Sequence, residues 1–424
     1  MAVAAHADRA RLATTAGGPS GHSTVRRPSH DAPPADSILP GIDVLLRDSL
    51  PLVAGKRVGL ITNQAGVTAA GVSTVEALAH APGVRLVALF APEHGLRGAG
   101  RPGEPLRDTL AGPDDTLDVP TGVPIYSLYG PRRAPTAAQL VALDVLLVDL
   151  QDVGARPFTY VSTTILAMRA AAAAGKRVIV LDRPDPIGCA VQGPVMQAAD
   201  TSFLGMLPVP LRHGMTLGEL ARFANARLGI GADLVVVPVA GWRRCEWFDR
   251  TGLPWVRPSP NLPDLESVAW YPGTVLFEAT NLSVGRGTDA PFRQVGAPWL
   301  DAARVARLVE RRYHLALTPV TFVPRGSGDG KYDGERVAGL RFPHFDRRRG
   351  DPVRDALRLL AAIRALQPGR LVVDTLGLAR RLGRPWRGGT AWPADVARFL
   401  RARRPFLIYG DSAGAPFASP EGPD

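Results

Sequence analysis

The feature that most constrains this 424-residue chain is a series of short, almost continuously apolar runs separated by helical stretches. The runs cover residues 57–62, 84–90, 144–150 and 177–182. Strands that are buried on both faces have such continuous Val/Ile/Leu patterns, and helices connect them when they run parallel. The fold class is therefore predicted to be α/β, with a Rossmann-like, doubly wound parallel sheet in the N-terminal part.

Further elements follow from the same kind of pattern. Helices are expected at 72–80, 163–174, 301–313 and 351–366, and strands at 234–239 and 275–277. One more helix should begin after Thr216, because Glu219 stands three residues later and completes a capping box. Residues 95–135, rich in Gly, Pro and Asp, are interpreted as a long loop that walls the cleft.

The chain divides into three predicted parts. Residues 1–37 are expected to be a disordered leader, and residues 38–262 a Rossmann-like catalytic domain. A Pro-rich connector at 258–263 leads into a smaller α+β domain at 263–424. The active site is expected in the cleft between the two domains.

Composition leaves several partners open. The formal net charge of +11 comes mainly from Arg, with basic runs at 347–349 and 401–404. These runs are typical of a solvated basic face, of a nucleic-acid surface, or of a surface that attracts a wall glycan carrying carboxylates. Cys189 and Cys245 can form at most one disulfide. No apolar run approaches the ~20 residues of a membrane-spanning helix, and no secretory signal with an apolar core is evident.

Polar residues gather where the predicted strands end. Glu93 and His94 directly follow the second apolar run, and Asn63 follows the first. Ligands bind at this edge of parallel α/β sheets, where a carboxyl group can serve as a general acid. The competing interpretation is that Glu93 or His94 only caps the next segment.

Three more clusters have the same placement. The sequence DLQDVGARPFTY at 149–160 follows the third strand, RHGMT at 212–216 precedes a helix, and EATNLSVGRGT at 278–288 follows the predicted strand at 275–277. An ordinary ion pair between Asp152 and Arg156 is the structural alternative for the first of them. The candidate side chains in these clusters are Asp149, Gln151, Asp152, Arg156, Tyr160, His213, Glu278, Asn281, Arg286 and Thr288, with Asn261 in the connector.

The motif search excludes several classes. The chain has no G-x-G-x-x-G after the first strand, no Walker A sequence, no G-x-S-x-G and no H-E-x-x-H. No cofactor and no metal are therefore expected. The remaining inventory of carboxylates, amides, Arg and Tyr suits sugars and their hydrolysis.

Collinear segments from residue 41 to residue 409 resemble the exo-β-N-acetylmuramidases of the NamZ family. They include GID at 41–43, GLITN at 59–63, APEHG at 91–95, DLQDVG at 149–154, RHGMTLGEL at 212–220, PNLP at 260–263, YPGT at 271–274, residues 278–288 and RPFLIY at 404–409. Phe158 stands where the family commonly has Tyr. The resemblance implies a Rossmann-like domain, a smaller C-terminal domain and release of N-acetylmuramic acid from the non-reducing end of peptidoglycan fragments.

The resemblance also implies roles. Glu93 matches the motif glutamate and would be the catalytic acid, and His94 would orient it or contact the substrate. Glu278 is the first candidate for a second carboxylate, ahead of Asp149 and Asp152, unless the 2-acetamido group of the sugar acts instead. The lactyl carboxylate of muramic acid should need a cation, for which Arg156 and Arg286 are the candidates.

Two competing functions use the same features. One is hydrolysis of another anionic amino sugar, and the other is non-catalytic binding of a cell-wall glycan. The expected partner in the main hypothesis is a peptidoglycan-derived muroglycan, with no membrane insertion, and nucleic acid ranks last because no recognition motif supports it. The family places the substrate outside the membrane, whereas residues 1–37 give no export signal.

Overall fold

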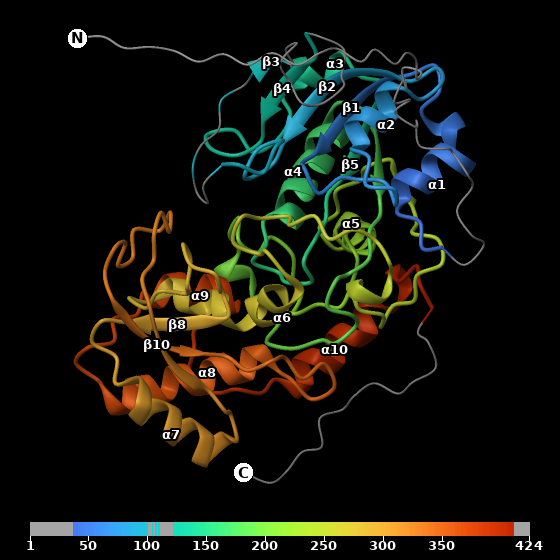
Figure 1. Ribbon diagram of the computed structural model, residues 1–424. Coiled ribbons are helices and arrows are strands. Elements are labelled where there is room, and N and C mark those ends of the chain that lie inside the picture. Colours follow the sequence, from blue (N-terminus) through green and yellow to red (C-terminus); the bar gives the residue numbers. More distant parts are fainter. Residues whose placement is uncertain (1–36, 101–103, 105–106, 108, 111–121, 411–424) are drawn as a thin grey trace, which may run out of the picture. The chain divides into compact units, whose positions relative to one another are not determined.

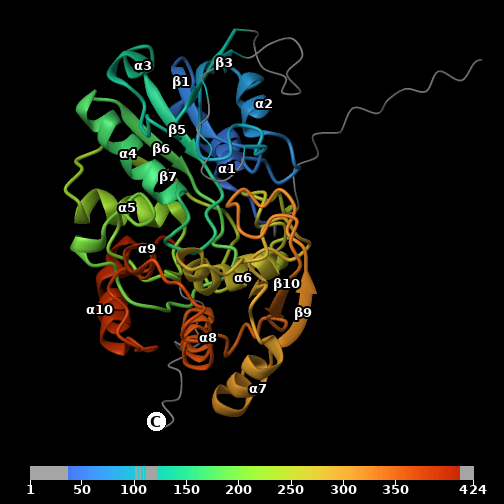
Figure 2. The ribbon, with the colours of Figure 1, turned by 90° about the vertical axis from the view of Figure 1, so that its left-hand side faces the viewer.

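The computed structural model describes residues 37–410, apart from 101–103, 105–106, 108 and 111–121. The predicted leader at 1–37 therefore lies outside the described residues except for its last position. A seven-stranded sheet forms the N-terminal domain, in the order β3-β4-β2-β1-β5-β6-β7 (Figures 1 and 2). Its strands are β1 (Arg57–Thr62), β2 (Arg85–Ala91), β3 (Thr109–Leu110), β4 (Pro124–Ser127), β5 (Val145–Asp149), β6 (Arg177–Leu181) and β7 (Leu234–Val237).

Six neighbouring strands, from β4 to β7, run parallel, and only β3 pairs antiparallel, with β4. This confirms the predicted α/β class. The segment at 95–135, predicted as a loop, contains β3 and β4, so the prediction was wrong there; much of its remainder lies outside the described residues. Short strands next to Gly and Pro give little periodic signal, which explains the error.

Helices cover both faces of the sheet, as Figure 2 shows. On β5, Val145 and Leu147 join the core with α1 and α2, whereas Leu146 and Val148 join the core with α3, α4 and α5. Successive strand side chains point to opposite faces, so a continuous apolar run serves both cores. The helices are α1 (Gly41–Asp48), α2 (Thr74–Ala79), α3 (Ala137–Val141), α4 (Tyr160–Ala173) and α5 (Leu217–Arg227).

The capping box predicted at the start of α5 is confirmed. The Thr216 hydroxyl accepts from the Glu219 N–H at 3.3 Å, and the Glu219 carboxylate accepts from the Thr216 N–H at 3.1 Å. The strand predicted at 275–277 was wrong. These residues form part of a 3-10 helix, η4 (Val275–Ala279), which continues directly from α6 (Leu265–Thr274). A short buried apolar run has the same pattern in either structure.

The C-terminal domain has a three-stranded antiparallel sheet in the order β8-β10-β9, against which α7 packs (Figures 1 and 2). Helix α8 packs on α6 and α7. The helices predicted at 301–313 and 351–366 are confirmed as α7 and α8. The elements are β8 (Gln294–Ala297), α7 (Ala302–Tyr313), β9 (Thr318–Phe322), β10 (Val337–Arg341), α8 (Pro352–Leu366), α9 (Thr375–Leu382) and α10 (Pro393–Arg403), with short 3-10 helices at Leu50–Leu52, Ala198–Asp200, Phe248–Arg250 and Arg404–Phe406.

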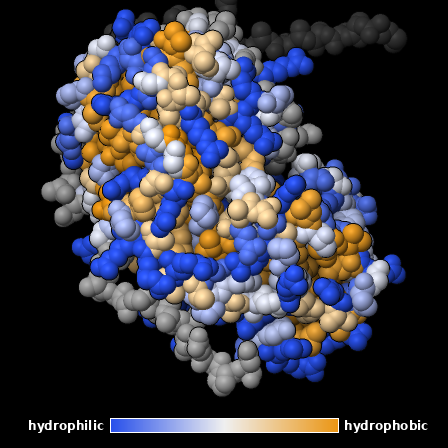
Figure 3. All heavy atoms as spheres, turned by 180° about the vertical axis from the view of Figure 1, so that it is seen from behind, coloured by the Kyte–Doolittle hydropathy of each residue, from blue (hydrophilic) through white to orange (hydrophobic). Residues whose placement is uncertain are grey.

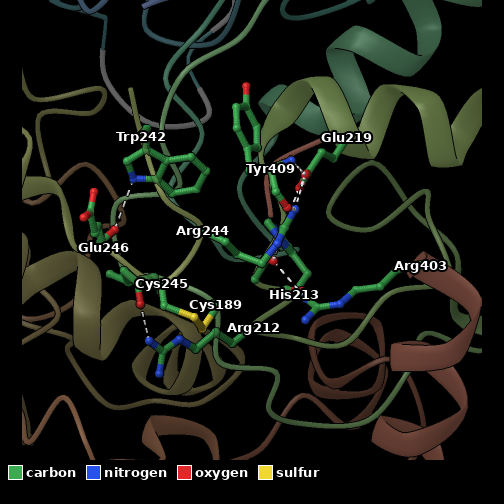
Figure 4. The surroundings of a disulfide bond; sticks show 12 residues. Cys189, Arg212, His213, Glu219, Trp242, Arg244, Cys245, Glu246, Arg403 and Tyr409 are labelled. Atoms are coloured by element: carbon green, nitrogen blue, oxygen red, sulfur yellow. Dashed lines mark hydrogen bonds and ion pairs between the residues drawn. A yellow bond between two sulfur atoms is a disulfide. The ribbon is translucent and has the colours of Figure 1, made fainter. Parts of the chain in front are cut away.

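The last described residues return to the N-terminal domain (Figure 4). The Tyr409 hydroxyl donates to Asp182 at 2.6 Å, and the Ile408 N–H donates to Glu219 at 2.8 Å. Glu219 also forms a buried ion pair with Arg244. Arg403, from one of the basic runs, is buried and donates to the carbonyl of His213 at 2.9 Å. Part of the basic sequence is therefore internal structure rather than a charged surface.

Cys189 and Cys245 form a disulfide that closes a segment of 56 residues (Figure 4). In the described part of the chain no helix is both long and apolar enough to cross a membrane. The face seen in Figure 3 mixes hydrophilic and hydrophobic side chains.

Candidate active site

Glu93 lies just beyond the C-terminal end of β2 and is half-buried. Its carboxylate accepts a hydrogen bond from the Thr159 hydroxyl at 2.8 Å. A second hydroxyl, that of Tyr129, also hydrogen-bonds the Glu93 side chain. Burial, followed by the charge of Glu93, raises the pKa of Tyr129, so this phenol stays protonated. Two neutral donors thus hold one carboxyl group at the edge of the sheet.

A chain of hydrogen bonds lies beside the backbone of Glu93. Asn63, which follows β1, donates to the Tyr160 hydroxyl at 2.6 Å, and that hydroxyl donates to the carbonyl of Pro258 at 2.7 Å. The Tyr160 hydroxyl also lies 3.5 Å from the carbonyl oxygen of Glu93. Asn63 and Tyr160 are therefore beside Glu93, but their polar atoms are bonded within the protein.

His94 adopts a left-handed backbone conformation, with φ of 73°. Its Nδ1 lies 3.0 Å from the carbonyl oxygen of Gly100, so this nitrogen carries the hydrogen. Burial lowers the pKa of His94, while the neighbouring Glu93 opposes the shift. A mostly neutral imidazole at neutral pH follows. The bond to Gly100 fixes the loop that carries Glu93.

Glu278 lies in η4 and binds two arginines. Arg286 contacts Oε1 of Glu278 through both Nε, at 3.0 Å, and Nη2, and Arg381 of α9 contacts Oε2 at 3.3 Å. Burial pushes the pKa of Glu278 upward, but the two guanidinium groups outweigh it, and the pKa lies below its ordinary value. Glu278 is therefore ionised at neutral pH. Lys331, which donates to the Glu278 carbonyl at 3.0 Å, adds a third cation.

Glu93 and the Glu278–Arg286 pair act on the same neighbours. The buried Tyr271 has a raised pKa, first because of burial and then because of the charges of Glu278 and Glu93. The positive charge of Arg286 acts on His94 and on Tyr129. The acid of the N-terminal domain and the acid of the C-terminal domain thus share one electrostatic environment.

Asp149 and Gln151 are buried and bonded within the fold. Asp149 receives two hydrogen bonds from Arg183, at 2.5 and 2.8 Å, and one from Thr74. The Gln151 amide donates to the carbonyls of Asp152 and Pro184, at 2.8 and 3.0 Å. Both residues stabilise the ends of β5 and β6.

Asp152 and His213 belong to a separate buried cluster. Oδ2 of Asp152 accepts from the Gly154 N–H at 2.8 Å and lies 3.4 Å from Nε2 of His213. Asp185 lies 4.0 Å from the other ring nitrogen. Burial raises the pKa of Asp185 to about 7, and the charge of Asp152 contributes. The ion pair between Asp152 and Arg156, the structural alternative above, does not form.

Arg156 is a buried anchor. Its guanidinium donates to the carbonyls of Pro194, Val209 and Arg381, at 3.0, 2.6 and 2.6 Å. Burial lowers the pKa of Arg156 to about 9. Because the carbonyl of Arg381 is one of its acceptors, Arg156 fixes the end of the helix whose Arg381 side chain binds Glu278.

The other predicted residues lie in loops. The Asn281 side chain joins its loop to the segment between α8 and α9. Its amide donates a hydrogen bond to the Arg370 carbonyl at 2.9 Å, and its oxygen accepts one from the Val372 N–H at 2.9 Å. The Thr288 hydroxyl donates to the Gly285 carbonyl at 2.6 Å, which closes the turn that carries Arg286. Asn261 is buried, and its N–H donates to the Ser259 hydroxyl at 3.3 Å.

Sequence reasoning missed four residues of this site: Thr159, Tyr129, Tyr271 and Arg381. Thr159 and Tyr271 lie within quoted motifs, so inspection of their hydroxyl groups would have found them. Tyr129 and Arg381 have no local signal, because only the tertiary fold brings them to Glu93 and Glu278. Among the described residues, no group of three or more His, Cys, Asp or Glu side chains could hold a metal ion.

Known proteins match this chain along most of its length. The family model for the N-terminal part of exo-β-N-acetylmuramidase NamZ matches residues 58–266, and the model for its C-terminal part matches residues 269–409. The chain belongs to the NamZ family. A relative, the peptidoglycan β-N-acetylmuramidase NamZ of Bacillus subtilis (strain 168), is 38% identical over 385 residues, which cover 87% of this chain and 91% of the relative.

Solved structures extend the comparison to the fold. One DUF1343 family protein from Bacteroides fragilis superposes with a TM-score of 0.79 at 33% identity, covering 89% of this chain and 100% of its own. A second from the same organism gives a TM-score of 0.65 at 28% identity, over 88% and 99% of the two chains. The segments by which the chain resembles NamZ enzymes include the Glu93 loop and the Glu278–Arg286 loop, which form the candidate site.

Proposed function

We propose that this protein is an exo-acting glycoside hydrolase that releases N-acetylmuramic acid from the non-reducing end of peptidoglycan fragments. The observation that carries the proposal is the position of Glu93 in a chain of the NamZ family. Its carboxyl group lies at the end of a parallel strand, between the hydroxyls of Thr159 and Tyr129. The Glu278–Arg286 pair of the C-terminal domain shares its electrostatic environment. We therefore assign the site to the place where residues of both domains meet around Glu93 and Glu278.

The proposed reaction breaks the bond between C1 of the terminal muramic acid unit and the glycosidic oxygen. Glu93 gives its proton to that oxygen as the bond lengthens, and water supplies the hydroxyl that C1 gains. A proton from the same water restores Glu93. Thr159 and Tyr129 hold the carboxyl group in one orientation, which a general acid needs for proton transfer over hydrogen-bond distance.

Two routes can stabilise C1 during the reaction. Glu278 is ionised and can act as a base, a nucleophile or an electrostatic partner of the positive sugar ring. Both of its oxygens already bind arginines, however, and this weakens it as a nucleophile. In the other route the 2-acetamido group attacks C1 internally. The anomeric configuration of the first product distinguishes these cases. It is inverted if Glu278 acts as a base toward water, and retained if Glu278 or the 2-acetamido group attacks C1.

Selectivity for muramic acid requires recognition of its lactyl carboxylate. Arg286 suits this role better, because only Nε and Nη2 of its guanidinium bind Glu278, and Nη1, which donates to none of the described residues, can bind the lactyl carboxylate. Arg156 suits it less, since its guanidinium is buried and already donates to three carbonyls. We therefore assign the lactyl group to Arg286, with Arg381 beside it and Arg156 as the anchor of Arg381.

The function is tested by analysis of products from defined fragments. The protein is incubated with a disaccharide that has muramic acid at its non-reducing end and with one that has N-acetylglucosamine there. Free N-acetylmuramic acid from the first, with the second intact, is the expected result. Binding of the first disaccharide without turnover would support a glycan-binding protein instead, and equal cleavage of both would exclude the proposed specificity.

A further inference from the structure

A pocket with a volume of about 440 Å³ lies where the segment after α9 meets the N-terminal domain. Trp386 and Trp392 line it together with Arg384 and Arg387. Gln197 contributes the wall from the N-terminal domain. Its volume falls in the range of about 300–1,000 Å³ that is typical of sites for small ligands.

The walls of this pocket are held by specific contacts. The Gln197 N–H donates to the Gly383 carbonyl at 2.8 Å, and the Trp386 indole donates to the Gly389 carbonyl at 3.0 Å. Arg384 forms an ion pair with Asp395 and donates to the Val195 carbonyl at 3.3 Å. The pocket is therefore built largely before any ligand arrives.

The two arginines that line the pocket differ in their ion pairs. Asp395 forms ion pairs with both Arg384 and Arg398, whereas Arg387 is exposed and forms no ion pair among the residues that the structure describes. One cation is thus available to a ligand, next to two large aromatic surfaces. Indole faces pack against the apolar C–H faces of sugar rings, and a guanidinium binds a carboxylate through charge-assisted hydrogen bonds.

The pocket is also close in sequence to the proposed active site. Arg381, whose guanidinium binds Glu278, is followed directly by Leu382, which lines the pocket. The last turn of α9 therefore connects the two places. A glycan chain that is cut at one end has further sugar units, and a second contact on the same chain raises their effective concentration at the site.

We propose that this pocket binds a carboxylate-bearing amino-sugar unit of the glycan, other than the unit that is hydrolysed. The inference rests on the proposed function for its substrate class. Trp386 and Trp392 would contact the sugar, and Arg387 would bind the carboxylate. Nucleic acid fits less well, because its affinity comes from many phosphate contacts, and in this pocket Arg387 is the one arginine without an ion pair to a described residue.

The test compares Arg387→Glu with Arg364→Glu, which makes the same charge change at an exposed residue of α8 outside the pocket. Each full-length variant is assayed on a single-sugar chromogenic β-N-acetylmuramide and on soluble glycan strands several disaccharides long. Arg387→Glu should raise KM for the strands about tenfold, as expected for loss of one charge-assisted bond, without changing kcat/KM for the single sugar. Arg364→Glu should change neither KM for the strands nor kcat/KM for the single sugar.

Several results would overturn the proposal. These are an unchanged KM for the strands, an equal loss on both substrates, or the same effect from Arg364→Glu. Binding of the strands to Glu93→Gln, followed by tryptophan fluorescence, separates this inference from the proposed function. If the wild type hydrolyses nothing but Arg387→Glu still weakens strand binding about tenfold, the pocket is supported and the activity is not. Displacement of bound strands by an oligonucleotide at equal concentration would contradict the choice of ligand.

Discussion

The hydroxyl of Thr159 lies 2.8 Å from Oε2 of Glu93, across 66 residues of sequence. Thr159 is the N-cap residue of α4, yet its side chain makes no capping hydrogen bond to that helix. The hydroxyl group that would ordinarily stabilise a helix end instead holds the proposed acid. The start of α4 therefore helps to orient the carboxyl group of Glu93.

Thr159→Val should reduce kcat on a muramide substrate by up to about tenfold, because the hydroxyl holds the protonated Glu93 carboxyl group in one orientation and a hydrogen bond between neutral groups contributes about 0.5–1.5 kcal/mol. The free energy of unfolding should fall by about 1 kcal/mol, because the same hydrogen bond is lost although no capping bond is. Thr159→Ser keeps the hydroxyl and is the matched control, expected near wild-type activity. An active Thr159→Val, or an inactive Thr159→Ser that is fully folded, would show that the contact is incidental.

Arg286→Ala should erase the preference for muramic over glucosamine substrates. The guanidinium is the proposed partner of the lactyl carboxylate, so kcat/KM should fall for a chromogenic muramide and much less for the corresponding glucosaminide. Thermal unfolding is measured alongside, because Glu278 loses one of its two arginine partners. Equal losses on both substrates would mean that Arg286 acts on Glu278 and not on the lactyl group.

Replacing both Cys189 and Cys245 by Ser should lower the free energy of unfolding by about 4 kcal/mol. The disulfide closes 56 residues, and the loss follows from the additional entropy of the open unfolded chain. Denaturant titration provides the measurement. When a reductant breaks the disulfide, the free energy of unfolding of the wild type should approach that of the double variant. A midpoint that is the same in all these samples would indicate that the covalent bond adds nothing to stability.

Asp185 should make stability depend on pH. Its pKa is raised to about 7 by burial, so between its unfolded value near 4 and pH 7 the folded protein holds a proton that the unfolded chain releases. Stability from this group is therefore present at pH 4 and is lost as the pH rises to 7, by about 1.4 kcal/mol per unit at most.

Asp185→Asn should remove that dependence, and its stability relative to the wild type should increase from pH 4 to pH 7. Asp48→Asn, at an exposed position, is the control and should show no such gain. Urea unfolding at several pH values gives both comparisons. A constant difference between Asp185→Asn and the wild type would mean that Asp185 is ionised in the folded protein throughout this range.

The sequence was sufficient to predict β1, β2, β5, β6 and β7 and the position of Glu93 after β2, because continuous apolar runs and strand-end polar residues are local signals. It could not separate the polar residues at the strand ends into those that face a substrate and those that bind each other. Asp149 ends β5 and Arg183 follows β6, so parallel pairing brings them together and each satisfies the other. Only the relative placement of the strands reveals this.

The role of Arg156 also could not be predicted from local sequence. As a cation within a polar motif it was a reasonable candidate for the lactyl carboxylate. Its acceptors come from residues 194, 209 and 381, which no local pattern connects to it. The contacts of Tyr129 with Glu93 and of Arg381 with Glu278 are also set by the tertiary fold. Sequence therefore placed the candidate residues at the strand ends, while the structure shows which of them are bonded within the fold.

The most direct test of the central claim, that Glu93 is the general acid, uses Glu93→Gln on two muramides. One carries a natural sugar as the leaving group, which needs a proton, and the other carries a strongly acidic phenol, which does not. With folding checked by thermal unfolding, the loss in kcat should be about 10²–10⁴-fold for the natural substrate and far smaller for the phenol. Equal losses on both substrates, or full activity on the natural one, would contradict the assignment.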